Sequence, residues 1–163
     1  MATAKWLRSV TLALLPMGIP LAALWVWHRE RLSYRYGRPL TENEKADAHT
    51  VGVKDPERVR VWLVERIEVF RSPFLNHLTA GLQQTFSTTI GITLRYGILI
   101  RHEWDGDRRL LVHELAHVAQ YERLGGILPF LLQYLRECIR DGYHSSQLEQ
   151  DAVSATRRIC KLP

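Results

Sequence analysis

The residues of this sequence best suited to chemistry form the short run His113-Glu114-Leu115-Ala116-His117. Two histidines four positions apart on a helix project from the same face, one turn apart, so both imidazoles can reach one metal ion. A glutamate beside the first histidine lies close to that ion without binding it, and it can accept a proton from a metal-activated water. The spacing therefore predicts a zinc site in which His113 and His117 bind Zn²⁺ and Glu114 is the general base.

The wider run V-H-E-L-A-H-V-A-Q resembles the active-site helix of the zincin metallopeptidases, and residues 94–155 carry the resemblance. The longer run H-E-L-A-H-V-A-Q-Y-E-R is also similar to bacterial domains with a minimal zincin core. In the gluzincin branch the third zinc ligand comes from a later helix, in a Glu-x-x-Ala context that Glu149-Gln150-Asp151-Ala152 matches. The resemblance implies a zinc-dependent peptidase that hydrolyses a peptide or protein substrate, with Glu149 as third ligand.

The third ligand has other candidates, because catalytic zinc takes three protein ligands from a wider set of residue types. Asp151 is one, and it would otherwise orient a histidine from outside the ligand set. His144 is another, and a set of three histidines would place the chain in a different zincin branch. The metzincin extension is absent, because Gln120 and Arg123 occupy the positions where it requires glycine and histidine.

Tyr143 and His144 directly precede the third-ligand helix, and either could donate a hydrogen bond to an oxyanion. For Tyr143, packing is the alternative interpretation. The chain as a whole also has a second interpretation, as a membrane-anchored zinc-binding or interaction module without hydrolytic activity. The intact Glu114 favours an enzyme, because a structural zinc site needs no free glutamate and usually has four protein ligands. His144 is a candidate fourth ligand and keeps this alternative open.

The elements that must position these residues can be read from capping and periodicity. A helix is predicted over residues 108–124, begun by Asp107 and stopped by Gly125-Gly126, and Pro129 lies in the first turn of the next. Thr41 and Glu44 have capping-box spacing. The further predicted elements are strands over 59–69, 86–94 and 96–101 and helices over 41–52, 129–141 and 147–159. Strands before helices predict an α+β fold, a small zincin-like domain with a short sheet packed on the motif helix and further C-terminal helices.

The N-terminal segment has a different character. Residues 10–27 are eighteen residues without a charge, near the lower limit for a transmembrane helix, and Trp6, Trp25 and Trp27 flank or close the run. A single-pass membrane anchor is predicted, with residues 28–40 as a basic linker. The alternative is a cleaved signal peptide and a secreted protein. The expected organisation is an anchor and linker over 1–40 and a metallohydrolase domain over 41–163.

Composition bounds the remaining function classes. The chain has 163 residues, enough for one domain, and a net charge of +5. Residues 1–40 hold this entire excess, and residues 41–163 contain 16 basic and 16 acidic side chains. A neutral body argues against nucleic-acid binding, and the arginines after the apolar run favour a membrane-associated protein with a cytoplasmic catalytic domain. Cys138 and Cys160 form no CxxC pair, which excludes a cysteine-based zinc knuckle.

Overall fold

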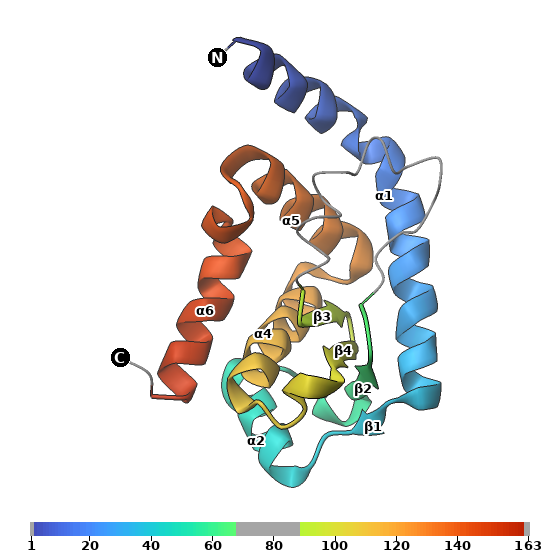
Figure 1. Ribbon diagram of the computed structural model, residues 1–163, viewed down its shortest axis with the longest axis vertical. Coiled ribbons are helices and arrows are strands. Elements are labelled where there is room, and N and C mark those ends of the chain that lie inside the picture. The colour runs from blue at the N-terminus through green and yellow to red at the C-terminus, as the bar shows by residue number, and fades with distance from the viewer. Residues whose placement is uncertain (1, 68–88, 162–163) are drawn as a thin grey trace.

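The computed structural model describes residues 2–67 and 89–161, with side chains from residue 18 onward (Figure 1). Its α-helices are α1 (Ala2–Tyr36), α2 (Glu42–Val51), α4 (Arg108–Leu124), α5 (Ile127–Asp141) and α6 (Gln147–Ile159). Its strands are β1 (Arg38–Pro39), β2 (Arg60–Val64), β3 (Gly91–Leu94) and β4 (Gly97–Arg101). Short 3-10 helices cover Pro56–Arg58, His102–Trp104 and Tyr143–Ser145. The predicted α+β class is confirmed.

The helix boundaries follow from the capping residues that the sequence carries. The Thr41 side chain accepts from the Glu44 backbone while the Glu44 side chain accepts from Thr41 N, which forms the predicted capping box on α2. Asp107 accepts from two backbone N–H groups of the first turn of α4. Gly125 ends α4 at φ 91, in the left-handed region that favours glycine. The helices predicted over 41–52, 108–124 and 147–159 are thereby confirmed, and α5 begins two residues before the predicted start at Pro129.

The sheet is mixed, with strand order β1-β2-β4-β3. β2 pairs with β4 in parallel, and β3 pairs with β4 as an antiparallel hairpin in which Leu94 lies opposite Gly97. The predicted strand over 59–69 is realised at Arg60–Val64 and the one over 86–94 at Gly91–Leu94. Residues 68–69 and 86–88 of those predictions lie outside the described residues.

The core lies on both faces of β4, because successive side chains of a strand point to opposite faces. Ile98 and Ile100 join a cluster with α2 and α4 that includes Leu111, Leu115 and Val118. Leu99 points to the other face and joins residues of α1 and α5, including Val26 and Phe130. In Figure 1, α6 lies on one side of α4 and α1 on the far side of the sheet. The motif helix α4 is therefore held between the sheet and α6.

The second half of α1 packs closely on this body. Ile19, Val26, Glu30 and Ser33 are buried, and the Glu30 carboxylate accepts a hydrogen bond from Tyr96 N. In the described part of the chain, no helix combines the length and the apolar character that a membrane crossing requires. The predicted span over 10–27 includes residues whose side chains lie outside the description. The anchor, and the division of the chain after residue 40, stay predictions.

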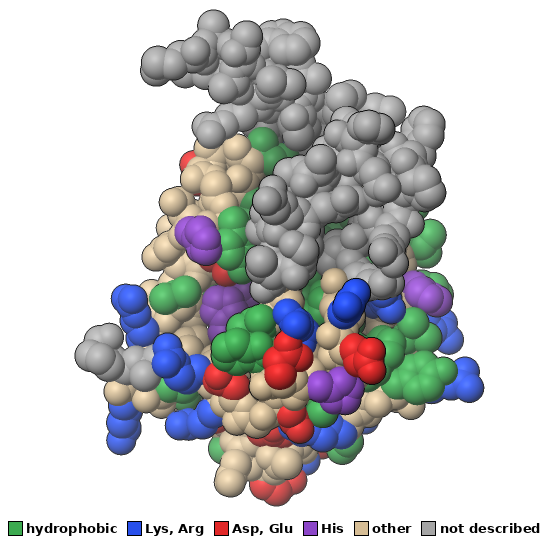
Figure 2. Space-filling view, in the orientation of Figure 1, with side chains coloured by type: hydrophobic (Ala, Val, Ile, Leu, Met, Phe, Trp, Pro, Cys, Tyr) green, Lys and Arg blue, Asp and Glu red, His purple; other side chains and the backbone are tan. Residues whose placement is uncertain are grey.

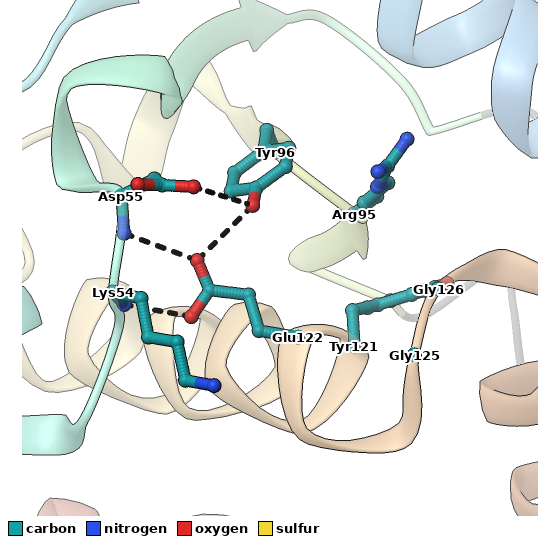
Figure 3. Close-up of a pocket in the computed structure, with 8 residues that line it drawn as sticks. All are labelled: Lys54, Asp55, Arg95, Tyr96, Tyr121, Glu122, Gly125 and Gly126. Carbon is teal, nitrogen blue, oxygen red and sulfur yellow. Dashed lines mark hydrogen bonds between the residues drawn. The ribbon is translucent and has the colours of Figure 1, made fainter.

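One carboxylate fastens the far end of α4 to the loop before β2 (Figure 3). Glu122 accepts hydrogen bonds from Lys54 N at 2.7 Å, from Asp55 N at 3.2 Å and from the Tyr96 hydroxyl at 3.2 Å. These residues line a cavity of about 210 Å³ that Arg95 and Gly125 also border. Glu122, engaged by three donors, thus links α4 both to the loop before β2 and to the β3–β4 turn.

The surface carries both signs of charge. On the described part of the face in Figure 2, Lys and Arg side chains are interspersed with Asp and Glu. Several of these charges are paired across elements, as in Arg108 with Asp47 at 2.8 Å and Arg38 with Glu44 at 2.8 Å. Pairs at or near the surface contribute little to stability, so the fold depends mainly on its apolar clusters.

Candidate metal centre

The central residues of α4 place the motif at the junction of three helices. His113 and His117 lie one turn apart on the side of α4 that faces α6, while Leu115 and Val118 point into the sheet core. His117 is buried, and His113 keeps 20% of its side chain exposed. The two imidazole rings lie edge to face, with centroids 4.8 Å apart. This geometry leaves the pair accessible from the His113 side.

Glu149 reaches the two histidines from the first turn of α6. Two side chains fix the start of this helix: Ser146 accepts from Glu149 N at 3.4 Å, and the buried Glu137 carboxylate of α5 accepts from Leu148 N at 2.9 Å. A helix N-terminus favours a negative charge, so it stabilises the ionised form of Glu149. Glu149 is 4% exposed, and its carboxylate therefore stands in a largely dry environment.

The aromatic side chains of α5 close the site from a third direction. Gly125 and Gly126 reverse the chain after α4, and Phe130 then stacks on Tyr121 with ring centroids 3.6 Å apart. One turn later the Tyr134 hydroxyl donates a hydrogen bond to Glu149 Oε1 at 2.7 Å. The rings of Phe130 and Tyr134 also lie edge to face with His117. They exclude water from the inner side of the cluster.

Each of the two histidines faces a different carboxylate oxygen of Glu149. His113 Nε2 and His117 Nε2 are 3.2 Å apart, His113 Nε2 is 3.3 Å from Glu149 Oε2, and His117 Nε2 is 3.4 Å from Glu149 Oε1. Tetrahedral zinc with bonds of about 2.0–2.2 Å requires ligand atoms roughly 3.3–3.6 Å apart. One ligand atom from each of the three residues lies within 4.8 Å of the other two, and the donor types suit a small divalent cation. The group of His113, His117 and Glu149 could hold a metal ion.

The charge of Glu149 also favours a bound cation in this cluster. Although burial by itself lowers the pKa of His117, the hydrogen bond and charge of Glu149 outweigh it and raise that pKa above its ordinary value. Burial raises the pKa of Glu149, but hydrogen bonds from His113 and His117 hold it well below the usual carboxyl range. The carboxylate is thus ionised, and either a proton on an imidazole or a metal ion must balance it.

Glu114 occupies a different position from the three clustered residues. It is 5% exposed and points toward β3, where Thr93 Oγ1 donates to Glu114 Oε2 at 2.7 Å. The same hydroxyl lies 2.9 Å from the backbone oxygen of Glu114. Glu114 is not a member of the metal-binding group. Glu114 is therefore a buried side chain that directly follows His113, and Thr93 holds one of its two carboxylate oxygens.

The structure separates the other candidate ligands from the cluster. Asp151 accepts from Gln147 Nε2 at 2.8 Å and lies 3.8 Å from Nη2 of Arg123, near the end of α4. His144 is exposed and packs against the ring of Tyr143. Among the described residues neither joins the group around His113. The Tyr143 residue is exposed, but desolvation of its hydroxyl and the charges of Glu149 and Glu114 raise its pKa, so its phenol remains a proton donor.

Four residues around the site were missed by sequence reasoning. Gly91 and Thr93 of β3 border Glu114, Tyr134 donates to Glu149, and Gln120 contacts His117. Only Gln120 carried a usable signal, because a residue three positions after a histidine on a helix lies beside it. The others come from elements whose distance from the motif only the tertiary packing defines.

Comparison of the chain with protein-family models, with curated proteins and with solved structures finds no match. The resemblance to zincins therefore rests on the motif itself.

Proposed function

We propose that this protein is a zinc-dependent hydrolase that cleaves peptide bonds, with Glu114 as general base. The observation that carries the proposal concerns two neighbouring features of the site. His113, His117 and Glu149 form a group that could hold a metal ion, and the residue directly after His113, Glu114, is a separate buried carboxylate. A site that only stores or anchors a metal does not need this extra carboxylate. The zincin-like order of His113, Glu114 and His117 supports the same assignment.

In the proposed site His113, His117 and Glu149 hold the ion. Bound zinc supplies Lewis acidity, which lowers the pKa of water and polarises a carbonyl oxygen. With only these three residues as ligands, the ion would keep a position open for water or substrate. The exposed edge of His113 marks the side from which a substrate reaches the centre.

The chain's own residues then perform the proton transfers. The Glu114 carboxylate accepts the proton of the attacking water and delivers it to the leaving nitrogen of the peptide. Thr93 holds Glu114 Oε2, which limits the rotation of the carboxylate. Tyr143, with its phenol protonated, is the proposed donor to the oxyanion that forms on the substrate carbonyl.

A second candidate is a zinc-binding module without hydrolysis. The observation in its favour is that the group takes two histidines from α4 and Glu149 from α6, so a bound ion would stabilise the docking of α6 on α4. The two candidates predict the same metal content and differ in turnover.

The test combines metal content with turnover. Purified protein is expected to contain about one zinc per chain, and His113→Ala and Glu149→Ala are expected to lose it, whereas Asp151→Ala keeps it. Turnover is followed on a library of fluorogenic peptides. Glu114→Gln should retain zinc and lose roughly 10²–10⁴-fold in turnover. Zinc binding without any cleavage that depends on Glu114 would favour the module, and no zinc in the parent would reject both candidates.

Attachment to a membrane through residues 10–27, with the catalytic domain on the cytoplasmic side, belongs to the same proposal. Its support is the uncharged run in the sequence and the exposed side chains of Leu21, Leu24 and Trp27 on α1. Flotation of the full chain with lipid vesicles tests it. Recovery of the chain in the vesicle-free fraction at every lipid concentration would contradict it.

A further inference from the structure

Gln120 lies three residues after His117 on α4, and its buried side chain stands between that histidine and the backbone of α6. Its Oε1 is 2.8 Å from His117 Nδ1, and its Nε2 donates to the backbone oxygen of Leu148 at 2.8 Å. Gln120 is 5% exposed, so both contacts are made away from solvent. Because both the oxygen and the nitrogen of this buried amide are hydrogen-bonded, Gln120 orients its neighbours as well as filling space.

The chemistry of these contacts fixes the orientation of every group. A backbone carbonyl can only accept a hydrogen bond, so Gln120 must present its NH2 group to Leu148. The amide oxygen then faces His117 Nδ1, which must carry the proton. In the neutral imidazole, His117 Nε2 then keeps its lone pair, and this is the atom that lies 3.2 Å from His113 Nε2 and 3.4 Å from Glu149 Oε1. The orientation of one amide thus determines which nitrogen of His117 is free to bind.

We propose that Gln120 is a positioning residue with two effects. It fixes the Nδ1–H tautomer of His117, and it sets the distance between α4 and the first turn of α6. The second effect follows from its acceptor, because the Leu148 carbonyl belongs to the residue directly before Glu149. Both groups of the Leu148 backbone are held, since its N–H donates to Glu137. Only the consequence for zinc affinity rests on the proposed metal site.

The tautomer can be measured without any metal. In the metal-free full chain with ¹⁵N-labelled histidine, at a pH alkaline enough to leave the imidazoles neutral, long-range ¹H–¹⁵N correlations report which ring nitrogen is protonated. Parent protein is expected to have the proton of His117 on Nδ1. In Gln120→Leu, which keeps the volume and removes both hydrogen bonds, the proton should move toward Nε2, where Glu149 can accept it. A proton on Nε2 of His117 in the parent would overturn the proposal, and this measurement needs no variant to fold.

Two further variants separate the two effects. Gln120→Glu keeps an acceptor for His117 Nδ1 but gives up the donor to Leu148, so the tautomer should survive. Gln150→Leu is the matched control, because Gln150 is an exposed residue directly after Glu149 whose side chain hydrogen-bonds the His144 backbone and has no hydrogen bond to His117 or Leu148 in the described structure. The control should keep the parent tautomer.

Zinc affinity gives the second readout. Loss of a partner that orients a metal-binding histidine typically lowers metal affinity about 10–100-fold. Gln120→Leu is expected to fall in this range, with Gln120→Glu between it and the parent, and with Gln150→Leu within about 2-fold of the parent. Equal affinities in Gln120→Leu and Gln150→Leu would overturn the positioning role. Failure of the parent to bind zinc, with the Nδ1–H tautomer observed, would instead reject the proposed metal site and leave the role of Gln120 in orienting His117 intact.

Discussion

The Cβ atom that Gly91 lacks would lie 2.7 Å from Oε1 of Glu114 and 3.2 Å from its Cδ. The backbone of β3 therefore forms one wall around the proposed general base, and Thr93 on the same strand holds the other carboxylate oxygen. The close approach confines Glu114 between a glycine and a hydroxyl.

Gly91→Ala should consequently move Glu114 while leaving the metal ligands in place. The added Cβ would also lie 3.0 Å from Cδ1 of Leu110, and the crowded groups are side-chain ends, so the expected loss of unfolding free energy is about 1–3 kcal/mol. A general base displaced by about 1 Å can cost roughly 10²-fold in turnover. Peptide hydrolysis, zinc content and urea denaturation are compared with those of the parent. Parent-like turnover would show that Glu114 does not need this position.

Thr93→Val tests the other side of the same carboxylate. The substitution preserves shape and removes the hydroxyl that bonds Glu114 Oε2, a hydrogen bond to a charged group that contributes about 1.5–3 kcal/mol. Stability should fall by this amount and turnover should fall with it, at unchanged zinc content. Thr156→Val is the control, because that buried hydroxyl bonds only the Ala152 carbonyl of its own helix. An equal loss of turnover in the control would exclude a specific role for Thr93.

Tyr134→Phe removes the hydroxyl that donates to Glu149 Oε1. Because Glu149 is buried and ionised, the metal-free protein should lose about 1.5–3 kcal/mol of unfolding free energy. Chemical denaturation in the presence of a chelator measures the loss. Tyr36→Phe, at an exposed ring, should change stability by no more than about 0.5 kcal/mol. A loss in Tyr134→Phe no larger than in this control would contradict the proposed support of Glu149.

The pH dependence follows from the shifted pKa values of His117 and Glu149. The folded pKa of Glu149 is lowered from 4.5, so its contribution to stability is complete above that value and is lost as pH falls through the folded pKa. The folded pKa of His117 is raised from 6.5, so its contribution is complete below that value and is lost as pH rises through the folded pKa. Their joint contribution in the metal-free protein is therefore complete between 4.5 and 6.5.

The affinity for zinc should rise with pH, whereas the contribution of His117 to the stability of the metal-free protein falls. The reason is that the ion must displace a proton from the His117 imidazole. The rise in melting temperature caused by zinc should increase as pH increases through the folded pKa of His117. Thermal denaturation with and without zinc across this range measures the effect. A zinc-induced shift independent of pH would mean that His117 is not a ligand.

Gly97→Ala tests the docking of α1 on the sheet. Its added Cβ would lie 2.6 Å from Ser33 Oγ and 2.8 Å from Ser33 Cβ, so the helix itself must move. The expected loss of stability is about 1–3 kcal/mol. Gly18→Ala on α1 should be neutral or slightly stabilising, because no described atom beyond its own helix backbone and chain neighbours lies within 4 Å of the added Cβ. Equal stability of the two variants would contradict the tight packing at Ser33.

The sequence alone determined the local features of this protein. The spacing of His113 and His117 defines one face of a helix, and Thr41, Asp107 and the glycine after α4 define where helices begin and end. These features depend on contacts between residues a few positions apart, which the fixed geometry of a helix makes predictable.

Tertiary structure decided which distant groups meet the motif. Glu149 and Asp151 are two positions apart, so they project about 200° apart around α6 and only one can reach the histidine pair. The start of α6, held by Ser146 and Glu137, turns Glu149 inward. The contacts of Gly91 with Glu114 and of Tyr134 with Glu149 likewise depend on how elements pack, which no local pattern in the sequence encodes.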